Sequence, residues 1–168
     1  NITSVSFPES IRIIDGNAFS NNEMEALFIP EGLEQLTRCA FSGCSNLERI
    51  QYNAVNAELR TTYEQSAFEN AGTSGLELII GDNVTTIPNH FFKNVTSLKS
   101  LTIGSSLAID PSGNNGYQAF MGCTGIETIL YKSYQGGFST TAAVFSGAGS
   151  VDNGIKVTFE KRVPYQMF

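Results

Sequence analysis

Length, composition and charge exclude several classes of protein before any motif is considered. The chain has 168 residues, a formal net charge of −6 and 41% apolar residues, which is enough for a hydrophobic core and argues against disorder. An acidic chain does not offer the basic face that nucleic-acid binding requires, and no apolar run approaches the roughly 20 residues of a membrane span. Charged residues make up 15% against about 25% in typical domains, so Ser, Thr, Asn and Gly occupy many polar positions.

Short segments of alternating apolar residues are the first predicted elements. Each has an apolar residue on both sides of one other residue, which is the period-two pattern of a β-strand. In chain order the predicted strands are Val5–Phe7, Leu27–Ile29, Ile50–Tyr52, Leu78–Ile80, Leu101–Ile103, Ile129–Tyr131 and Val157–Phe159. A further apolar anchor, such as Met24 or Leu98, often precedes the strand by three positions, but Gly75 and Gly154 take that place in two repeats.

A turn and a second apolar pair follow several of the strands. Pro30 and Gly81 stand directly after a strand and favour a sharp change of direction, because Pro fixes its φ angle and Gly tolerates a positive one. The apolar pair Leu33 and Leu36, and its equivalents in other repeats, then predict an extended stretch that contributes to the core.

A turn that carries Phe comes next in each repeat. The dipeptide Ala-Phe, or a variant of it, ends at Phe19, Phe41, Phe68, Phe92, Phe120 and Phe145, with steps of 22, 27, 24, 28 and 25 residues. We expect these rings to form the repeat core on the side of the stack away from the strands. Cys44 and Cys123 stand three residues after such a Phe, where Ala71 and other small residues stand elsewhere, so they are predicted to be tightly packed core residues.

A repeat of this length cannot bury its own apolar side, but stacked copies can share a continuous core. Stacked strands are then parallel and about 4.8 Å apart. The predicted fold class is therefore a curved, right-handed repeat solenoid, with a parallel β-sheet on one face and turns, extended segments or short 3-10 turns on the other. Residues 1–168 are predicted to be a single repeat domain of about six repeats and a partial seventh that ends at Val163–Phe168.

The repeat resembles the leucine-rich repeat of BspA-type bacterial surface proteins. The best copy runs from Met24 to Asn46 and contains Leu27, Ile29, Pro30, Leu33, Leu36, Ala40, Phe41 and Cys44; Leu98 to Cys123 is a second good copy. Such repeats occur in secreted or cell-wall proteins of gut and oral bacteria and in some parasitic protists. The resemblance implies an extracellular or cell-surface location and adhesion to host cells or extracellular-matrix proteins. Since neither end has the pattern of a polar cap, we expect either a fragment of a longer array or a chain with irregular caps.

Motifs for catalysis or cofactor binding are absent from the sequence. His90 is the one histidine and is predicted to be a solvated residue of a Phe turn. Asp82, Asp110 and Asp152 lie in turns that lack the spacing of a calcium loop, so no metal site is predicted. We therefore expect neither enzymatic activity nor a cofactor, although a pair of carboxylates for glycoside cleavage remains an open alternative.

The middle residue of each predicted strand faces away from the core, because successive strand side chains point to opposite sides. In a parallel stack these residues line up on one open face. The candidate binding residues are Phe28, Gln51, Ile79, Thr102 and Leu130, together with Arg49 and Glu77, which directly precede two of the strands. Exposed apolar side chains in a row favour a partner site. The alternative is that they are ordinary sheet formers or are covered by neighbouring chain.

The favoured function is a non-catalytic extracellular binding module, either a cell-surface adhesin or a protein–protein interaction repeat. The expected partner is a protein, such as a host extracellular-matrix protein, or a cell-surface glycan. The sheet face or the inserts at Asp110–Gly116 and Tyr134–Gly137 are predicted to bind it. The alternative function is a structural spacer that projects another domain from the cell wall.

Overall fold

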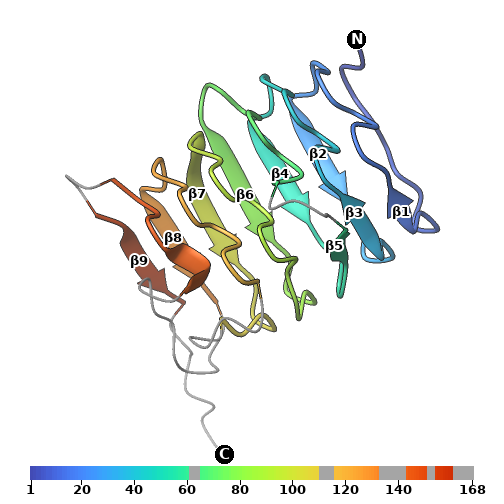
Figure 1. Ribbon diagram of the computed structural model, residues 1–168. Helices are drawn as coiled ribbons and strands as arrows, with labels where there is room; N and C mark the ends of the chain where they lie inside the picture. Colours follow the sequence, from blue (N-terminus) through green and yellow to red (C-terminus); the bar gives the residue numbers. More distant parts are fainter. Residues whose placement is uncertain (61–64, 110–115, 133–142, 151–153, 161–168) are drawn as a thin grey trace, which may run out of the picture.

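The computed structural model describes residues 1–60, 65–109, 116–132, 143–150 and 154–160. Of the two predicted inserts, Gly116 alone falls within these ranges, and the predicted end of a seventh repeat, Val163–Phe168, lies outside them. Figure 1 shows the described chain as a row of stacked coils, in which strands from successive repeats lie side by side.

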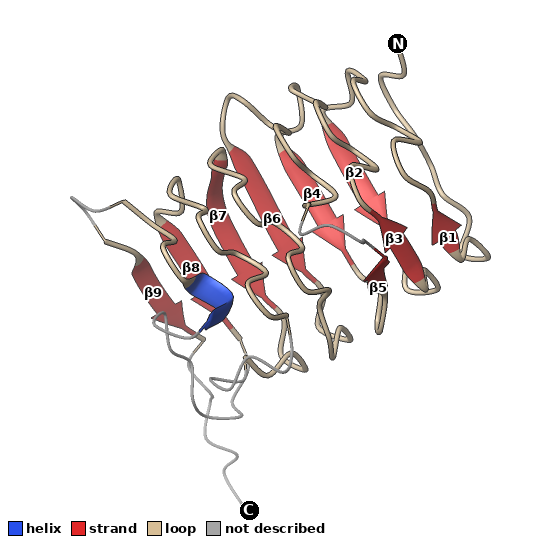
Figure 2. Ribbon diagram, viewed as in Figure 1, coloured by secondary structure: helices blue, strands red, loops and turns tan. Residues whose placement is uncertain are grey.

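The main sheet confirms the predicted solenoid. Its strands, in spatial order, are β2 (Ala26–Ile29), β4 (Arg49–Tyr52), β6 (Leu76–Ile80), β7 (Leu98–Ile103), β8 (Thr128–Tyr131) and β9 (Lys156–Phe159). Every neighbouring pair is parallel, which requires each strand to come from a new coil of the chain. Among the described residues the one helix is a short 3-10 helix, η1 (Ala143–Phe145), on the side opposite the sheet (Figure 2).

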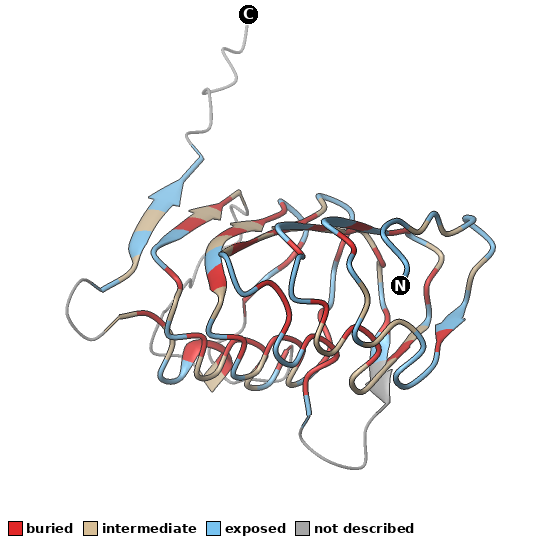
Figure 3. Cartoon of the chain, turned by 90° about the horizontal axis from the view of Figure 1, so that it is seen from above, coloured by how far each residue is buried: buried red, intermediate tan, exposed pale blue. Residues whose placement is uncertain are grey.

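The register of the main sheet aligns the inward-facing residues of all repeats. Leu27 pairs with Ile50, Ile50 with Leu78, and the row continues through Leu101 and Ile129. Each of these side chains has at most 2% of its surface exposed. Since every coil shares this row with its neighbours, the core is continuous, and Figure 3 shows buried residues along the inside of the whole stack.

The predicted first strand, Val5–Phe7, is wrong. These residues form no strand, and Phe7 instead places its ring edge-on against Phe19, with 5.3 Å between the ring centroids. The same ring lies 6.5 Å from that of Phe41. Phe7 therefore packs against the aromatic ring of the first Phe turn in the described chain. This tertiary contact overrides the strand-like alternation of the segment.

A second, smaller sheet forms from the predicted extended stretches. Its strands are β1 (Ile13–Ile14), β3 (Gln35–Thr37) and β5 (Glu58–Arg60), and they are parallel in that order. Ile14 pairs with Leu36, and both are buried against the same core as the main sheet. The extended stretch therefore supplies a second short wall in the first three repeats.

Leu76, and not Gly75, occupies the anchor position at the start of the third strand of the main sheet. Leu76 pairs with Leu98, and the register of the two strands shifts between Leu76 and Glu77. Leu76 is fully buried, so it takes the anchor place that the sequence spacing assigns to Gly75. Gly75 has a φ angle of 116°, which an L side chain rarely adopts, and the lead-in from Leu76 to Leu78 is one residue shorter than the one from Leu98 to Leu101. The assignment of Gly75 to the anchor position is therefore wrong.

The six repeat Phe residues form a continuous stack, which we call the Phe ladder. It consists of Phe19, Phe41, Phe68, Phe92, Phe120 and Phe145, with successive ring centroids 5.5, 5.4, 4.5, 6.2 and 5.2 Å apart. Phe19 is partly exposed at one end, whereas the other rings are buried. Rings at these distances attract each other beyond the burial of their area, so the ladder couples each repeat to the next.

A residue in the left-handed backbone conformation stands two positions after each residue of the Phe ladder, and these residues form a column. Two positions after each ladder Phe, the φ angle lies between 55 and 70° at Asn21, Gly43, Asn70, Asn94, Gly122 and Gly147. Gly and Asn are the residues that adopt this conformation most readily. The N–H groups of Asn21 and Gly43 donate to carbonyl oxygens of the next repeat, at 2.8 and 2.9 Å. The turns thus form a second hydrogen-bonded ladder opposite the sheet.

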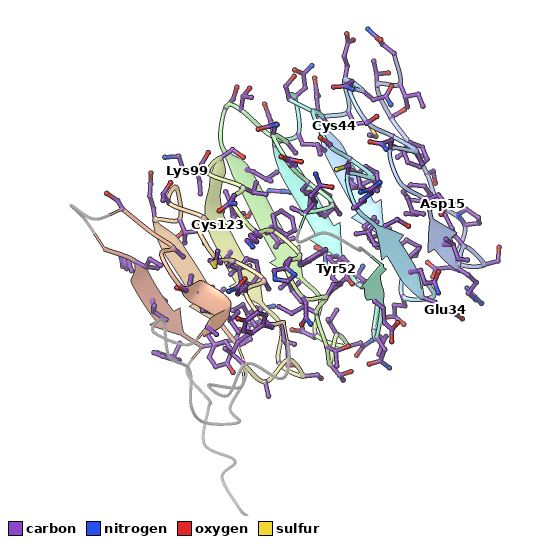
Figure 4. All side chains as sticks on the ribbon, viewed as in Figure 1. Asp15, Glu34, Cys44, Tyr52, Lys99 and Cys123 are labelled. Atoms are coloured by element: carbon purple, nitrogen blue, oxygen red, sulfur yellow. The ribbon has the colours of Figure 1, made fainter. Side chains whose placement is uncertain are left out.

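Cys44 and Cys123 lie inside the stack (Figure 4) and link neighbouring repeats. The Cys44 thiol donates to the carbonyl oxygen of Phe19 at 3.0 Å, and the Cys123 thiol donates to that of Phe92 at 2.9 Å. Both acceptors belong to the preceding repeat. Burial raises the pKa of the Cys123 thiol to about 12. Cys44, Cys123 and Cys39 are all free thiols.

Candidate binding face of the main sheet

Five candidate residues from five neighbouring strands form one row on the open side of the sheet. Phe28 pairs in register with Gln51, which is followed by Ile79, Thr102 and Leu130 on β6, β7 and β8. We call this row the face row. Phe28 is 49% exposed, and the other four side chains are partly exposed. The described chain therefore leaves the row accessible to solvent.

Apolar and polar side chains alternate along the face row. Phe28, Ile79 and Leu130 are apolar, while Gln51 and Thr102 stand between them. Because neighbouring strands lie about 4.8 Å apart, an apolar side chain recurs about every 10 Å along the row. A rigid sheet holds this spacing fixed, which is the arrangement expected of a surface that contacts a partner at several points.

Charged residues beside the face row are paired across strands. The Arg49 Nε atom lies 2.7 Å from a carboxylate oxygen of Glu77 on the adjacent strand. Lys99, at the start of β7 (Figure 4), lies 2.7 Å from a carboxylate oxygen of Glu127. Exposed pairs of this kind stabilise a fold by about 0–1 kcal/mol. Their main effect here is to neutralise charge along the amino-terminal side of the face row.

A hollow opens beside the face row at the carboxyl end of the strands, and we call it the edge pocket. Its volume is about 370 Å³. Gln51 and Ile79 of the face row line it, and the other lining residues lie at or beyond strand ends: Glu31, Asn53, Ile80, Gly81, Asp82, Asn83 and Lys132. The parallel strands all end at this edge of the sheet, so turn residues from several repeats gather there.

Amide side chains of the edge pocket hold one another in place. The Gln51 Nε2 group donates to Asn53 Oδ1 at 2.8 Å, and the Asn83 Nδ2 group donates to Glu31 Oε1 at 2.9 Å. Glu31 follows β2 and Asn83 follows β6, so the second bond bridges over β4. The pocket is therefore shaped by contacts within and between repeats before any ligand arrives.

The far wall of the edge pocket is an ion pair. The Lys132 ammonium group lies 3.7 Å from Asp82 Oδ1, and the same oxygen accepts the backbone N–H of Ser105 at 3.1 Å. Lys132 follows β8 whereas Asp82 follows β6, so its side chain reaches across the intervening repeat. The pocket lining thus contains one ammonium group, paired with Asp82, and the further carboxylate of Glu31.

The two carboxylates of the edge pocket are open to solvent. Glu31 and Asp82 are both exposed, whereas a general acid normally needs apolar surroundings that keep it protonated. Across the described part of the chain, no three His, Cys, Asp or Glu side chains come together as a metal centre would require. No helix among those residues has the length and apolar character needed to cross a membrane.

His90 lies in the Phe turn where the sequence places it, with a φ angle of 57°. Its Nε2 atom is 3.1 Å from Gln118 Oε1, and its ring is edge-on to that of Tyr117, with 5.8 Å between the centroids. Both partners belong to the next repeat. The imidazole is half-buried between these partners, so the prediction of a solvated turn residue needs correction.

Sequence reasoning places Gln51 and Ile79 on the face but misses the rest of the edge pocket. The signal lies in the one to three positions that follow each strand. These positions hold Glu31 after β2, Asn53 after β4, and Asp82 with Asn83 after β6. Aligning the strand ends of a predicted parallel sheet would have brought these polar residues together.

One family model agrees with this architecture. The family model of the BspA type leucine-rich repeat region matches residues 1–76 and 61–145, in six copies. Among solved structures, a leucine-rich repeat protein from Bacteroides ovatus ATCC 8483 is similar, with 20% sequence identity and a TM-score of 0.35. The match covers 95% of this chain but only 51% of that protein, so the chain spans about half the length of the protein that it matches. No curated protein matches the sequence.

Proposed function

Since the chain belongs to the family of BspA-type leucine-rich repeats, we propose that it is a non-catalytic binding module whose face row contacts a protein partner. Repeats of this family generally serve protein interactions and are generally found in bacterial surface or secreted proteins. The proposal extends to a cell-surface or secreted adhesin, with a host extracellular-matrix protein as its partner.

The face row is the observation that supports this proposal. Phe28, Ile79 and Leu130 are accessible apolar side chains held in register on a rigid sheet. Exposed apolar groups contribute binding energy when a partner removes them from water, at about 25 cal/mol per Å². Fixed positions keep the entropic cost of ordering these side chains low.

Replacement of the three apolar face-row residues by Ser tests the proposal. We expect Phe28→Ser, Ile79→Ser and Leu130→Ser in combination to weaken binding to immobilised matrix proteins at least about tenfold. Ile13→Ser is the matched control, because Ile13 is 51% exposed but belongs to the smaller sheet. Far-UV circular dichroism and thermal unfolding verify that each variant is folded.

Two outcomes would contradict the proposal. In the first, the folded triple variant binds a matrix protein as tightly as the unchanged chain does. In the second, no matrix protein binds the unchanged chain at all, which would favour the spacer hypothesis. Equal losses of binding affinity in the triple variant and in Ile13→Ser would show that the face row is not the binding surface.

A further inference from the structure

The edge pocket presents hydrogen-bond donors and acceptors around an apolar wall. Within the described residues, the bond from Gln51 to Asn53 leaves the Gln51 Oε1 acceptor and the Asn53 amide nitrogen without a protein partner. The bond from Asn83 to Glu31 likewise leaves the Asn83 Oδ1 acceptor and the second carboxylate oxygen of Glu31 without a partner among those residues. Donors and acceptors from different repeats thus lie close together in one pocket.

From this arrangement we propose that the edge pocket binds a neutral, hydroxyl-rich saccharide unit. A hydroxyl group can donate one hydrogen bond and accept two, so neighbouring hydroxyls on a sugar ring can satisfy mixed donors and acceptors together. A single ammonium or carboxylate group can satisfy only one kind. The volume of about 370 Å³ lies within the range of small-molecule sites, about 300–1,000 Å³. This inference goes beyond protein binding by the face row and does not depend on it.

The apolar part of the pocket fits the other face of a sugar. Ile79 is partly exposed beside the amide groups, and it offers an aliphatic surface on which the C–H groups of a pyranose can pack. Gly81 leaves room for this arrangement, because a Cβ atom at that position would come within 2.2 Å of Asn53 Oδ1. A larger residue at 81 would therefore displace the Asn53 side chain from its bond with Gln51.

Charge restricts the saccharide to a neutral one. Glu31 and Asp82 both line the pocket, and Lys132 is already paired with Asp82 at 3.7 Å. A sulfate or carboxylate on the sugar would meet a carboxylate without a free cation to balance it. Repulsion between like charges in a partly enclosed site disfavours such a ligand.

A glycan panel tests the inference directly. The probes are immobilised neutral oligosaccharides of hexose and N-acetylhexosamine, compared with sialylated and sulfated ones. We expect binding to at least one neutral probe, reduced at least about tenfold by Asn53→Ala and by Asn83→Ala. Thr102→Ala is the matched control, since Thr102 belongs to the face row but does not line the pocket, and it should bind like the unchanged chain. Thermal unfolding verifies that the variants are folded.

Further variants separate this inference from the proposed function. Phe28→Ser should lower protein binding and leave saccharide binding unchanged, because Phe28 does not line the pocket. Glu31→Gln should reduce the discrimination against sulfated probes and keep the shape of the site. The inference is overturned if no neutral probe binds, if anionic probes bind better than neutral ones, or if both Asn variants bind as the unchanged chain does.

Discussion

The rings of Phe41 and Phe68 stack with their centroids 5.4 Å apart and their planes 7° from parallel, although the two residues belong to different repeats. This contact is one link of the Phe ladder, which runs from Phe19 to Phe145. In such an array each repeat is stabilised by its neighbours as much as by its own contacts. The loss of one ring should therefore weaken the repeats on both sides of it.

Replacement of Phe41 by Ala should destabilise the fold by about 3–5 kcal/mol, the range found for buried aromatic residues. Phe41 has 0% of its surface exposed and contacts a ring on each side. Phe19→Ala should cost less, because Phe19 is partly exposed at the end of the ladder. Urea unfolding monitored by circular dichroism measures both. A loss below about 1 kcal/mol for Phe41→Ala would show that the ladder is not part of the stabilising core.

A side chain at Gly122 should be poorly tolerated. Gly122 has a φ angle of 70°, and a Cβ atom there would lie 2.2 Å from the Asn94 Oδ1 atom of the preceding repeat. Gly122→Ala combines backbone strain with this clash, so we expect a loss of about 1–3 kcal/mol. Gly16→Ala is the control, because its Cβ atom would come no closer than 3.4 Å to any neighbour. Equal midpoints of unfolding for the two variants would contradict the left-handed conformation that we assign to the turn at Gly122.

The three thiols should differ in reactivity. Cys44 and Cys123 are buried, whereas Cys39 is partly exposed. The pKa of the Cys39 thiol is raised, mainly by burial and to a smaller extent by the charge of Glu69, so Cys39 should react with an alkylating reagent slowly but detectably. Mass spectrometry after iodoacetamide treatment should find one modified cysteine in the folded chain and three after unfolding. Modification of Cys123 in the folded chain would contradict its place in the core.

Alkaline pH should destabilise the fold. Burial raises the pKa of the Cys123 thiol from 9.0 to about 12, so the folded chain favours the protonated form. Its contribution to stability is therefore complete below about pH 9 and is lost as the pH rises toward about 12. Burial raises the pKa of Tyr52 as well, which acts in the same direction. Urea unfolding at a series of alkaline pH values measures the loss.

The variant Cys123→Ala provides the control for this pH dependence. Without the thiol, the free energy of unfolding should fall less steeply above about pH 9 than it does in the unchanged chain. Identical slopes in the two proteins would show that Cys123 does not titrate in the way that its burial requires.

Period-two alternation was sufficient to predict the main sheet and the face row. Leu27 and Ile29 are buried while Phe28 is exposed, and burial alternates in the same way in β4, β6 and β8, so the in-register stack could be predicted from this pattern. In β9, the last described strand, the pattern fails, because Phe159 is 57% exposed. The Asn or Gly two positions after each ladder Phe was equally visible in the sequence, although its meaning depends on the left-handed turn that it forms.

Features that depend on contacts between repeats could not be predicted in this way. Val5–Phe7 has the alternation of a strand, yet Phe7 packs edge-on against Phe19 and the segment forms no strand. Gly75 has the spacing of an anchor, yet a shift in register gives that place to Leu76. The bond between Glu31 and Asn83 joins residues 52 positions apart, which no local pattern reveals.

A bulky charged residue at the centre of the face row tests the central claim most directly. Thr102 stands between Ile79 and Leu130 and points toward solvent, so Thr102→Arg should fold normally but block the approach of a partner. The dissociation constant for the matrix protein that binds the unchanged chain most tightly is the quantity to measure. The account predicts an increase of at least about tenfold, or about 1.4 kcal/mol. An unchanged dissociation constant for the folded variant would contradict it.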